Sequence, residues 1–166
     1  MDITKVKIIS LEKDFIRAIR LIDKLIEING YTLKYSLNLD YGSKNYGDFD
    51  PLKANKIYLN PSLVHEAKRY EDPHALYFTS DFSIYAVAIH EFSHLLDAKL
   101  NIGEKYEKAF PNRLYLNKNS RMDRREELAE VMGLYILNPY LLKMIDKSRY
   151  IFLKRIFRSP TRCGKI

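Results

Sequence analysis

The sequence contains one cysteine and no long hydrophobic run. A single cysteine, Cys163, cannot form a disulfide within the chain, which excludes a disulfide-rich secreted scaffold. No apolar stretch approaches the length of a transmembrane helix, and charged residues interrupt the first ten positions, where a signal peptide would have an apolar core. We therefore expect a cytoplasmic protein without a signal peptide, with phage association or export by a non-classical route as alternatives.

The chain does contain enough apolar material for a substantial core. Of its 166 residues, 46% are hydrophobic and 30% are charged, which excludes a mostly disordered chain. The length suits one ordinary domain, and the sequence has no internal repeat, low-complexity tract or linker. We expect a single domain over residues 1–158, followed by a flexible basic tail over residues 159–166.

The formal net charge of +7 arises entirely in the last part of the chain. Residues 143–166 contain one acidic and eight basic residues, so the remaining residues sum to zero. Four of the basic residues form a stripe at helical spacing: Lys143, Lys147, Lys154 and Arg158. This segment predicts contact with an anionic partner, either nucleic acid or an anionic surface. The alternative is a solvated helix face, because no nucleic-acid-binding motif accompanies the charge.

Hydrophobic periodicity and capping residues predict helices on both sides of a region of short strands. The expected helices cover residues 11–29, 81–99, 123–137 and 138–157, and the expected strands cover residues 31–39 and 56–60, with a loop over residues 41–50. Asn138 followed by Pro139 is typical of a helix N-terminus. The strand at residues 56–60 is expected to be an edge strand able to pair with an extended peptide. This order predicts an α+β fold with a small mixed sheet and a mainly helical C-terminal half.

The residues with the clearest chemistry are His90-Glu91-Phe92-Ser93-His94, an HExxH pattern inside the expected helix 81–99. Side chains at positions i and i+4 share one face of a helix, so both imidazoles can bind one metal ion. Zinc lowers the pKa of a bound water, and Glu91 is placed to accept the proton of that water as general base. The pattern predicts metal-assisted hydrolysis with water as the nucleophile.

A catalytic zinc site needs a third protein ligand and an open fourth position. The residue six positions after His94 is Leu100, which excludes the metzincin arrangement with a third histidine. Glu126 and Glu130 share a face of the next strong helix, so one can bind the metal while the other hydrogen-bonds a ligand histidine. We favour Glu126 as the ligand, and we expect Glu127, about 100° away, to face solvent. The alternative is a solvated acidic patch paired with nearby arginines.

Two further residues are predicted to assist the site. Asp97, three residues after His94, either orients an imidazole or is a surface acid near the helix end. Hydrolysis also needs a donor for the developing oxyanion. Of thirteen tyrosines, we select Tyr115 because it lies in the connection that leads to the second metal-binding helix.

The two metal-binding helices resemble those of zinc metallopeptidases related to the anthrax lethal factor catalytic domain and the clostridial Pro-Pro endopeptidases. The resemblance is specific at residues 90–97 (HEFSHLLD) and 126–132 (EELAEVM), and looser at residues 55–60, which resemble the strand before the active-site helix. It covers about residues 46–155. It implies a zincin-like fold, a bound Zn²⁺, Glu126 as metal ligand and Glu130 as the acid that follows.

The sequence departs from this family at two positions near the ligand. Family members have a catalytic tyrosine seven residues before the ligand glutamate, where this chain has Asn119, and a phenylalanine directly after it, where this chain has Glu127. A second resemblance is to ImmA/IrrE-type metallopeptidases, which act on phage or stress repressors. It rests on residues that fit their E-x-x-A-x-x-F...L-x-P helix: Glu126, Ala129, Met132, Leu137 and Pro139.

The sequence therefore predicts a zinc-dependent metalloendopeptidase. His90, His94 and Glu126 are expected to bind Zn²⁺, and the substrate is expected to be a protein or peptide. The alternatives are a catalytically degenerate zincin and an ImmA/IrrE-like regulatory protease of phage or mobile-element origin, with the basic C-terminal helix binding nucleic acid or an anionic surface.

Overall fold

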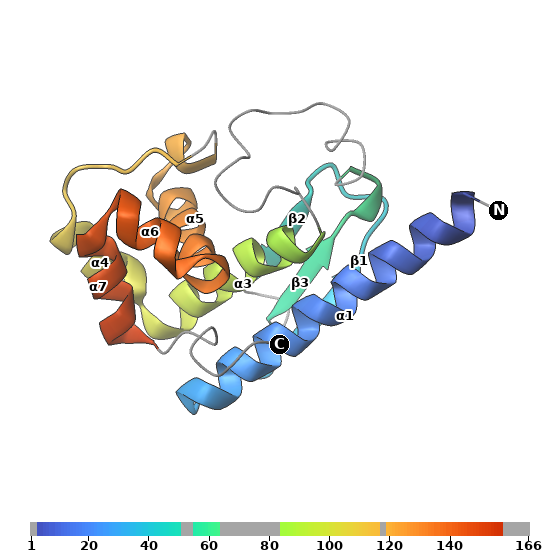
Figure 1. Ribbon diagram of the computed structural model, residues 1–166, viewed down its shortest axis with the longest axis horizontal. Helices are drawn as coiled ribbons and strands as arrows, with labels where there is room; N and C mark the ends of the chain where they lie inside the picture. Colours follow the sequence, from blue (N-terminus) through green and yellow to red (C-terminus); the bar gives the residue numbers. More distant parts are fainter. Residues whose placement is uncertain (1–2, 51–54, 64–83, 117–118, 158–166) are drawn as a thin grey trace.

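The computed structural model describes residues 3–50, 55–63, 84–116 and 119–157, with the side chains of residues 3–12, 84, 85 and 119 excepted (Figure 1). In chain order its elements are α1 (Ile3–Asn29), β1 (Ser36–Leu39), β2 (Gly47–Asp50), β3 (Lys56–Leu59), α3 (Ile84–Leu100), α4 (Ile102–Ala109), the 3₁₀ helix η2 (Asn119–Arg121), α5 (Arg124–Leu137), α6 (Pro139–Ile145) and α7 (Lys147–Ile156). The prediction of an α+β fold is confirmed. The predicted tail at residues 159–166 lies outside the described residues.

The three strands form one small mixed sheet in the order β1-β3-β2. β1 runs parallel to β3, and β2 runs antiparallel to it. The prediction that residues 56–60 form an edge strand is wrong, because β3 is paired on both sides. Residues 47–50 were expected in a loop and form β2 instead. Of the predicted strand 31–39, only the last four residues pair.

The first helix is longer than predicted and packs on α3 with one apolar stripe. The buried residues of the stripe are Ala18, Leu21, Ile22 and Leu25. Gly30 ends the helix, with φ of 65° and its N–H bonded to the carbonyl of Glu27. A positive φ is favourable for glycine, which explains why the helix stops at this residue.

The C-terminal half contains two short helices where one was expected. Asn138 caps α6 as predicted, and Pro139 is its first residue. The helix ends after Ile145 because Asp146 leaves the helical conformation and caps α7, accepting a hydrogen bond from the N–H of Arg149 at 2.9 Å. Lys143 and Lys147 therefore lie on different helices, so the predicted single stripe of basic residues is wrong.

The core is centred on α3, which packs against α1 and strands β2 and β3 and also against α5 (Figure 1). Ile57 and Leu59 of β3 contribute fully buried side chains from the sheet, and Phe92 and Leu95 do so from α3. These contacts enclose α3 and hold its polar residues at fixed positions.

No helix among the described residues is long and apolar enough to cross a membrane.

Candidate metal centre

Helix α3 carries the HExxH residues on a largely buried backbone. Its fully buried apolar residues include Ala88, Ile89 and Phe92, and they fix the orientation of α3 about its own axis. His90 and His94 are one turn apart, so both rings project toward α5. Their ring centroids lie 4.8 Å apart, and the rings are nearly perpendicular at 82°.

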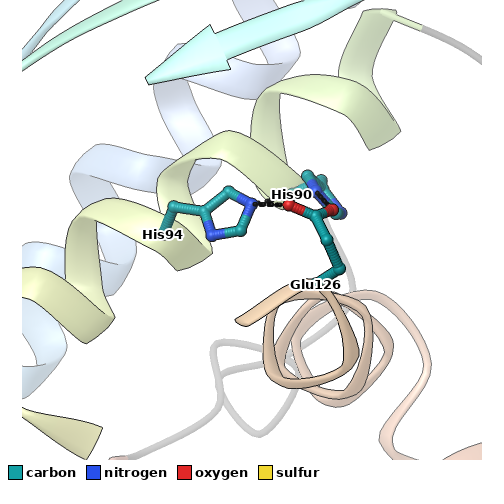
Figure 2. Close-up of side chains that lie close together, drawn as sticks. All are labelled: His90, His94 and Glu126. Carbon is teal, nitrogen blue, oxygen red and sulfur yellow. Dashed lines mark hydrogen bonds and ion pairs between the residues drawn. The ribbon is translucent and has the colours of Figure 1, made fainter. Parts of the chain in front are cut away.

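Glu126 of α5 brings a carboxylate to the two imidazoles, as Figure 2 shows. Its Oε2 lies 3.2 Å from His90 Nε2, and its Oε1 lies 3.3 Å from His94 Nε2. The two Nε2 atoms are 3.1 Å apart. The structure thus brings together the three residues that the sequence predicted as metal ligands, within 4.8 Å of one another.

These three separations can be compared with the edges of a zinc coordination tetrahedron. Zinc binds imidazole nitrogen and carboxylate oxygen at about 2.0–2.2 Å, so two ligand atoms in a tetrahedral site lie about 3.3–3.5 Å apart. The two imidazole nitrogens are 3.1 Å apart, close to this length, and each faces a different oxygen of the Glu126 carboxylate, at 3.2 Å for Oε2 and 3.3 Å for Oε1. The Glu126 side chain is 25% exposed, which leaves the cluster accessible on that side. The donor types therefore fit a zinc ion, and one ligand atom from each residue lies within 4.8 Å of the other two.

No protein-family model, curated protein or solved structure matches this chain. Its function must therefore be argued from its own residues.

Glu130 lies behind the cluster, one turn after Glu126 on α5. Its Oε1 is 3.0 Å from His90 Nδ1, and its side chain is buried. Because Nδ1 faces Glu130, the Nε2 atom of His90 faces His94 and Glu126. This carboxylate–imidazole contact is the arrangement that fixes ring orientation in metal-binding histidines. It is the geometry expected for Glu130 from the spacing of the sequence.

The carboxylates around His90 favour the protonated form of its imidazole. Burial alone lowers the pKa of His90, but hydrogen bonds to Glu126 and Glu130 outweigh it and raise this pKa to about 10. Burial favours a raised pKa for Glu126, yet hydrogen bonds from His90 and His94 hold it well below its usual value. A metal ion binds neutral imidazole, so its binding here would release the proton of His90.

Glu91 lies against the start of β2, and its carboxyl interacts electrostatically with His90, His94 and Glu126. It is 8% exposed, and burial raises the pKa of its carboxyl against the opposing effect of the two imidazoles. Gly47, the first residue of β2, lies directly against it. A Cβ atom at Gly47 would be 2.7 Å from Glu91 Cγ, 2.8 Å from Glu91 Oε1 and 2.7 Å from Val87 Cγ1. Strand β2 can approach α3 this closely only because residue 47 has no side chain.

Sequence reasoning missed Gly47, and it also missed Asn60, which holds the chain before β2. The buried Asn60 amide donates to the carbonyls of Tyr41 and Ser43, and its backbone N–H donates to the carbonyl of Tyr46. The alternation Gly47-Asp48-Phe49-Asp50 was the available signal for β2. No local signal predicts the role of either residue, because the contacts of both join segments far apart in the sequence.

If Glu91 is the general base that the sequence predicts, Gly47→Ala is expected to impair hydrolysis more than metal binding. The new methyl group would displace the Glu91 carboxylate, and misplacement of a catalytic group by about 1 Å can cost 10²-fold in rate. We expect a roughly 10- to 100-fold lower kcat/KM with unchanged zinc content, measured by peptide hydrolysis and metal analysis. Gly42→Ala is the control, because its Cβ would meet only Asp40 Oδ1 at 3.4 Å. Equal activity of the two variants would contradict this role of Gly47.

Asp97 has the second of the two roles predicted for it, that of an acid near the helix end. Its Oδ1 accepts a hydrogen bond of 2.6 Å from the N–H of Gly103, in the first turn of α4. Among the described residues, no hydrogen bond joins it to His90 or His94. Asp97 thus satisfies a free N–H group at the start of α4, which corresponds to the alternative of an acid near the helix end and not to an imidazole-orienting residue.

Tyr115 lies in the connection before α5 and is 57% exposed. The Arg113 guanidinium carbon lies 5.2 Å from the centroid of its ring. This contact does not involve the histidines or Glu126. Its proposed role as an oxyanion donor stays a prediction.

The expectation that Glu127 faces solvent is wrong. Its side chain is fully buried and paired with three arginines. Helices α4 and α7 and the chain between α4 and α5 cover the face of α5 that carries it.

Of the four predicted anionic-partner residues, three are described and exposed: Lys143, Lys147 and Lys154. Arg158 lies outside the described residues. Lys143 Nζ lies 6.0 Å from the centroid of the Tyr150 ring. No ion pair among the described residues neutralises Lys147 or Lys154, so their charges face solvent.

Proposed function

We propose that this protein is a zinc-dependent metalloendopeptidase with a zincin-like fold. The observation that carries the proposal is the convergence of two imidazoles and one carboxylate. His90 Nε2 and His94 Nε2 are 3.1 Å apart, Glu126 Oε2 lies 3.2 Å from the first, and Glu126 Oε1 lies 3.3 Å from the second. Two imidazoles and one carboxylate, with a fourth position accessible, form the ligand set of hydrolytic zinc sites. The packing of α3 between a small sheet and α5 is compatible with such a fold.

Each residue of the site has a defined task in this proposal. His90, His94 and Glu126 hold the ion, and Glu130 fixes the His90 ring through Nδ1. Zinc, when bound, supplies a Lewis acid that lowers the pKa of water toward neutrality. Glu91 accepts the proton of the attacking water and passes it to the leaving amine. Burial raises the pKa of Glu91, which brings it closer to the operating pH of a general base.

The test is metal analysis combined with a peptide-library assay. We expect the purified protein to carry about one zinc per chain and to cleave members of the library. A chelator is expected to stop cleavage, and added Zn²⁺ is expected to restore it. A folded protein that binds no zinc would exclude the proposal. A zinc-bound protein that cleaves nothing would instead support the degenerate zincin, and selective cleavage of repressor-like proteins would favour the ImmA/IrrE-like alternative.

A second candidate function, binding to an anionic surface, is favoured by the solvent-facing charges of α6 and α7. Lys143, Lys147 and Lys154 are exposed, and the apolar side chains of Tyr140 and Met144 are exposed beside them in the sequence. Exposed lysines next to aromatic and aliphatic groups suit an anionic lipid interface.

We expect salt-dependent binding to phosphatidylserine vesicles, at about 1 kcal/mol per lysine near the surface. The double variant K147E/K154E should weaken this binding by roughly 10-fold or more, measured by vesicle sedimentation. The double variant K13E/K44E, at exposed positions outside α6 and α7, lowers the net charge by the same amount and is the control. Binding that is indifferent to salt would contradict the electrostatic role, and preference for DNA over vesicles would assign the lysines to nucleic acid.

A further inference from the structure

Glu127 follows the proposed metal ligand Glu126, but its carboxylate points into a separate buried cluster. It accepts hydrogen bonds from five donors: Tyr106 Oη at 2.9 Å, Arg113 Nε at 3.2 Å, the N–H of Leu114 at 3.1 Å, Arg124 Nη1 at 3.1 Å and Arg149 Nη2 at 3.2 Å. We call this set the Glu127 cluster. A carboxylate has about four lone-pair sites, so these donors use its full capacity. Glu127 is therefore not a spare metal ligand.

Stability alone is a weak explanation for burying these charges. Moving a carboxylate and guanidinium groups out of water has a desolvation cost, and apolar side chains of similar volume often serve stability equally well. Buried ionic groups do, however, enforce particular geometries in some proteins. The geometry that this cluster fixes is that of the first turn of α5, which carries Glu126.

Arg113 connects both ends of that turn. Its Nε donates to Glu127, and its Nη2 donates to the carbonyl of Asp123 at 2.9 Å. Asp123 in turn caps the helix, because its Oδ1 accepts from the N–H of Glu126 at 2.9 Å. The first turn of a helix has N–H groups without intrahelical partners and is prone to fraying. A single guanidinium thus holds the residues on either side of Glu126.

Arg149 ties the same turn to other elements of the C-terminal half. This α7 residue donates to Glu127, to Tyr106 Oη of α4 at 2.6 Å and to Asp146 Oδ2 at 2.6 Å. Helices α4, α5 and α7 meet at one end of the molecule (Figure 1). The start of α5 is consequently positioned by two other helices and by the connection that contains Arg113.

We propose that Glu127 is a positioning residue, whose buried pairing with Arg113, Arg124 and Arg149 sets the Glu126 carboxylate at the distance from His90 and His94 that metal binding requires. This inference rests on the proposed function for the role of Glu126. It adds a specific reason for a charged residue at a position that α5 could fill with an apolar one.

The test compares Glu127→Gln and the milder Arg113→Lys with a destabilised control. Glutamine keeps the shape of Glu127 and removes its charge, and Arg113→Lys keeps a charge but cannot bridge Asp123 and Glu127. Leu25→Ala, in the α1 stripe, is the control because it leaves a cavity in a helix that contributes no donor to the Glu127 cluster. The readouts are the Zn²⁺ dissociation constant, from competition with a chelator, and the visible spectrum of Co²⁺ bound in place of zinc.

We expect both cluster variants to bind Zn²⁺ about 10-fold or more weakly, the loss typical for residues that orient metal ligands, and to show an altered Co²⁺ spectrum. Leu25→Ala should keep the wild-type affinity and spectrum even when its melting temperature is lower. Wild-type affinity and spectrum in Arg113→Lys and in any folded Glu127→Gln would overturn the inference.

Hydrogen exchange on the metal-free proteins separates this inference from the proposed function. We expect Glu127→Gln and Arg113→Lys to accelerate amide exchange first at residues 124–128, whereas Leu25→Ala should accelerate it across the core. A wild-type protein that binds no metal would refute the proposed function. Unchanged exchange at residues 124–128 in the variants would refute the positioning role whether or not the metal binds.

Discussion

Glu91→Gln is expected to retain zinc and to lose hydrolysis almost completely. The amide has the size of the carboxylate and still fits against Gly47, but it cannot accept a proton from water. General-base catalysis by a positioned side chain contributes typically 10²- to 10⁴-fold, so kcat/KM should fall by about that factor. The measurement is peptide hydrolysis at matched zinc content.

The same substitution should not harm folding. Burial disfavours the charged form of Glu91, as its raised pKa shows, and a neutral amide avoids that cost. We expect the melting temperature of Glu91→Gln to equal or exceed that of the wild-type protein. Full activity in this variant would exclude Glu91 as the general base, and loss of zinc would show that the carboxylate serves metal binding instead.

Removal of the metal is expected to cause a large loss of thermal stability. A ligand that binds only the folded state at 1,000 times its dissociation constant stabilises it by about 4 kcal/mol. In a chain of this length, each kcal/mol shifts the melting temperature by roughly 2–4 °C, so chelation should lower it by about 8–16 °C. Differential scanning calorimetry with and without chelator measures the difference.

Glu126→Ala supplies the matched control for this experiment. The substitution removes the proposed third ligand, and its side chain is partly exposed, so little packing is lost. The melting temperature of this variant should be insensitive to chelator. A wild-type protein that melts at one temperature in both conditions would contradict a stabilising metal, and an unchanged chelator effect in Glu126→Ala would show that another residue completes the site.

The parts of the structure that the sequence predicted well depend on local rules. Asp123 and Asn138 cap α5 and α6 through their own side chains, and the i, i+4 spacing alone puts His90 and His94 on one face. The prediction that Glu126 faces these two histidines required one further assumption, namely that α5 packs on α3. No local rule supplies that packing, because it joins helices far apart in the sequence.

The errors concern contacts between distant segments. A helical wheel places Glu127 on a different face of α5 from Glu126. It does not show that Arg149 of α7 and Arg113 of the connection before α5 cover that face. Strand pairing on both sides of β3 is equally non-local. The break at Asp146 was the exception: an aspartate that accepts from the N–H three residues later is a local capping signal, and the basic periodicity around it obscured it.

Helix α7 carries both exposed lysines and a buried arginine, which matters for the design of shortened variants. The helix displays Lys147 and Lys154 to solvent on one side and sends Arg149 into the interior on the other. Deleting α7 to remove positive charge would also remove the Arg149 guanidinium, which pairs with Glu127 in the first turn of α5. Surface point changes can therefore test the proposed anionic-surface binding and the proposed hydrolysis separately, whereas a shorter chain would alter both.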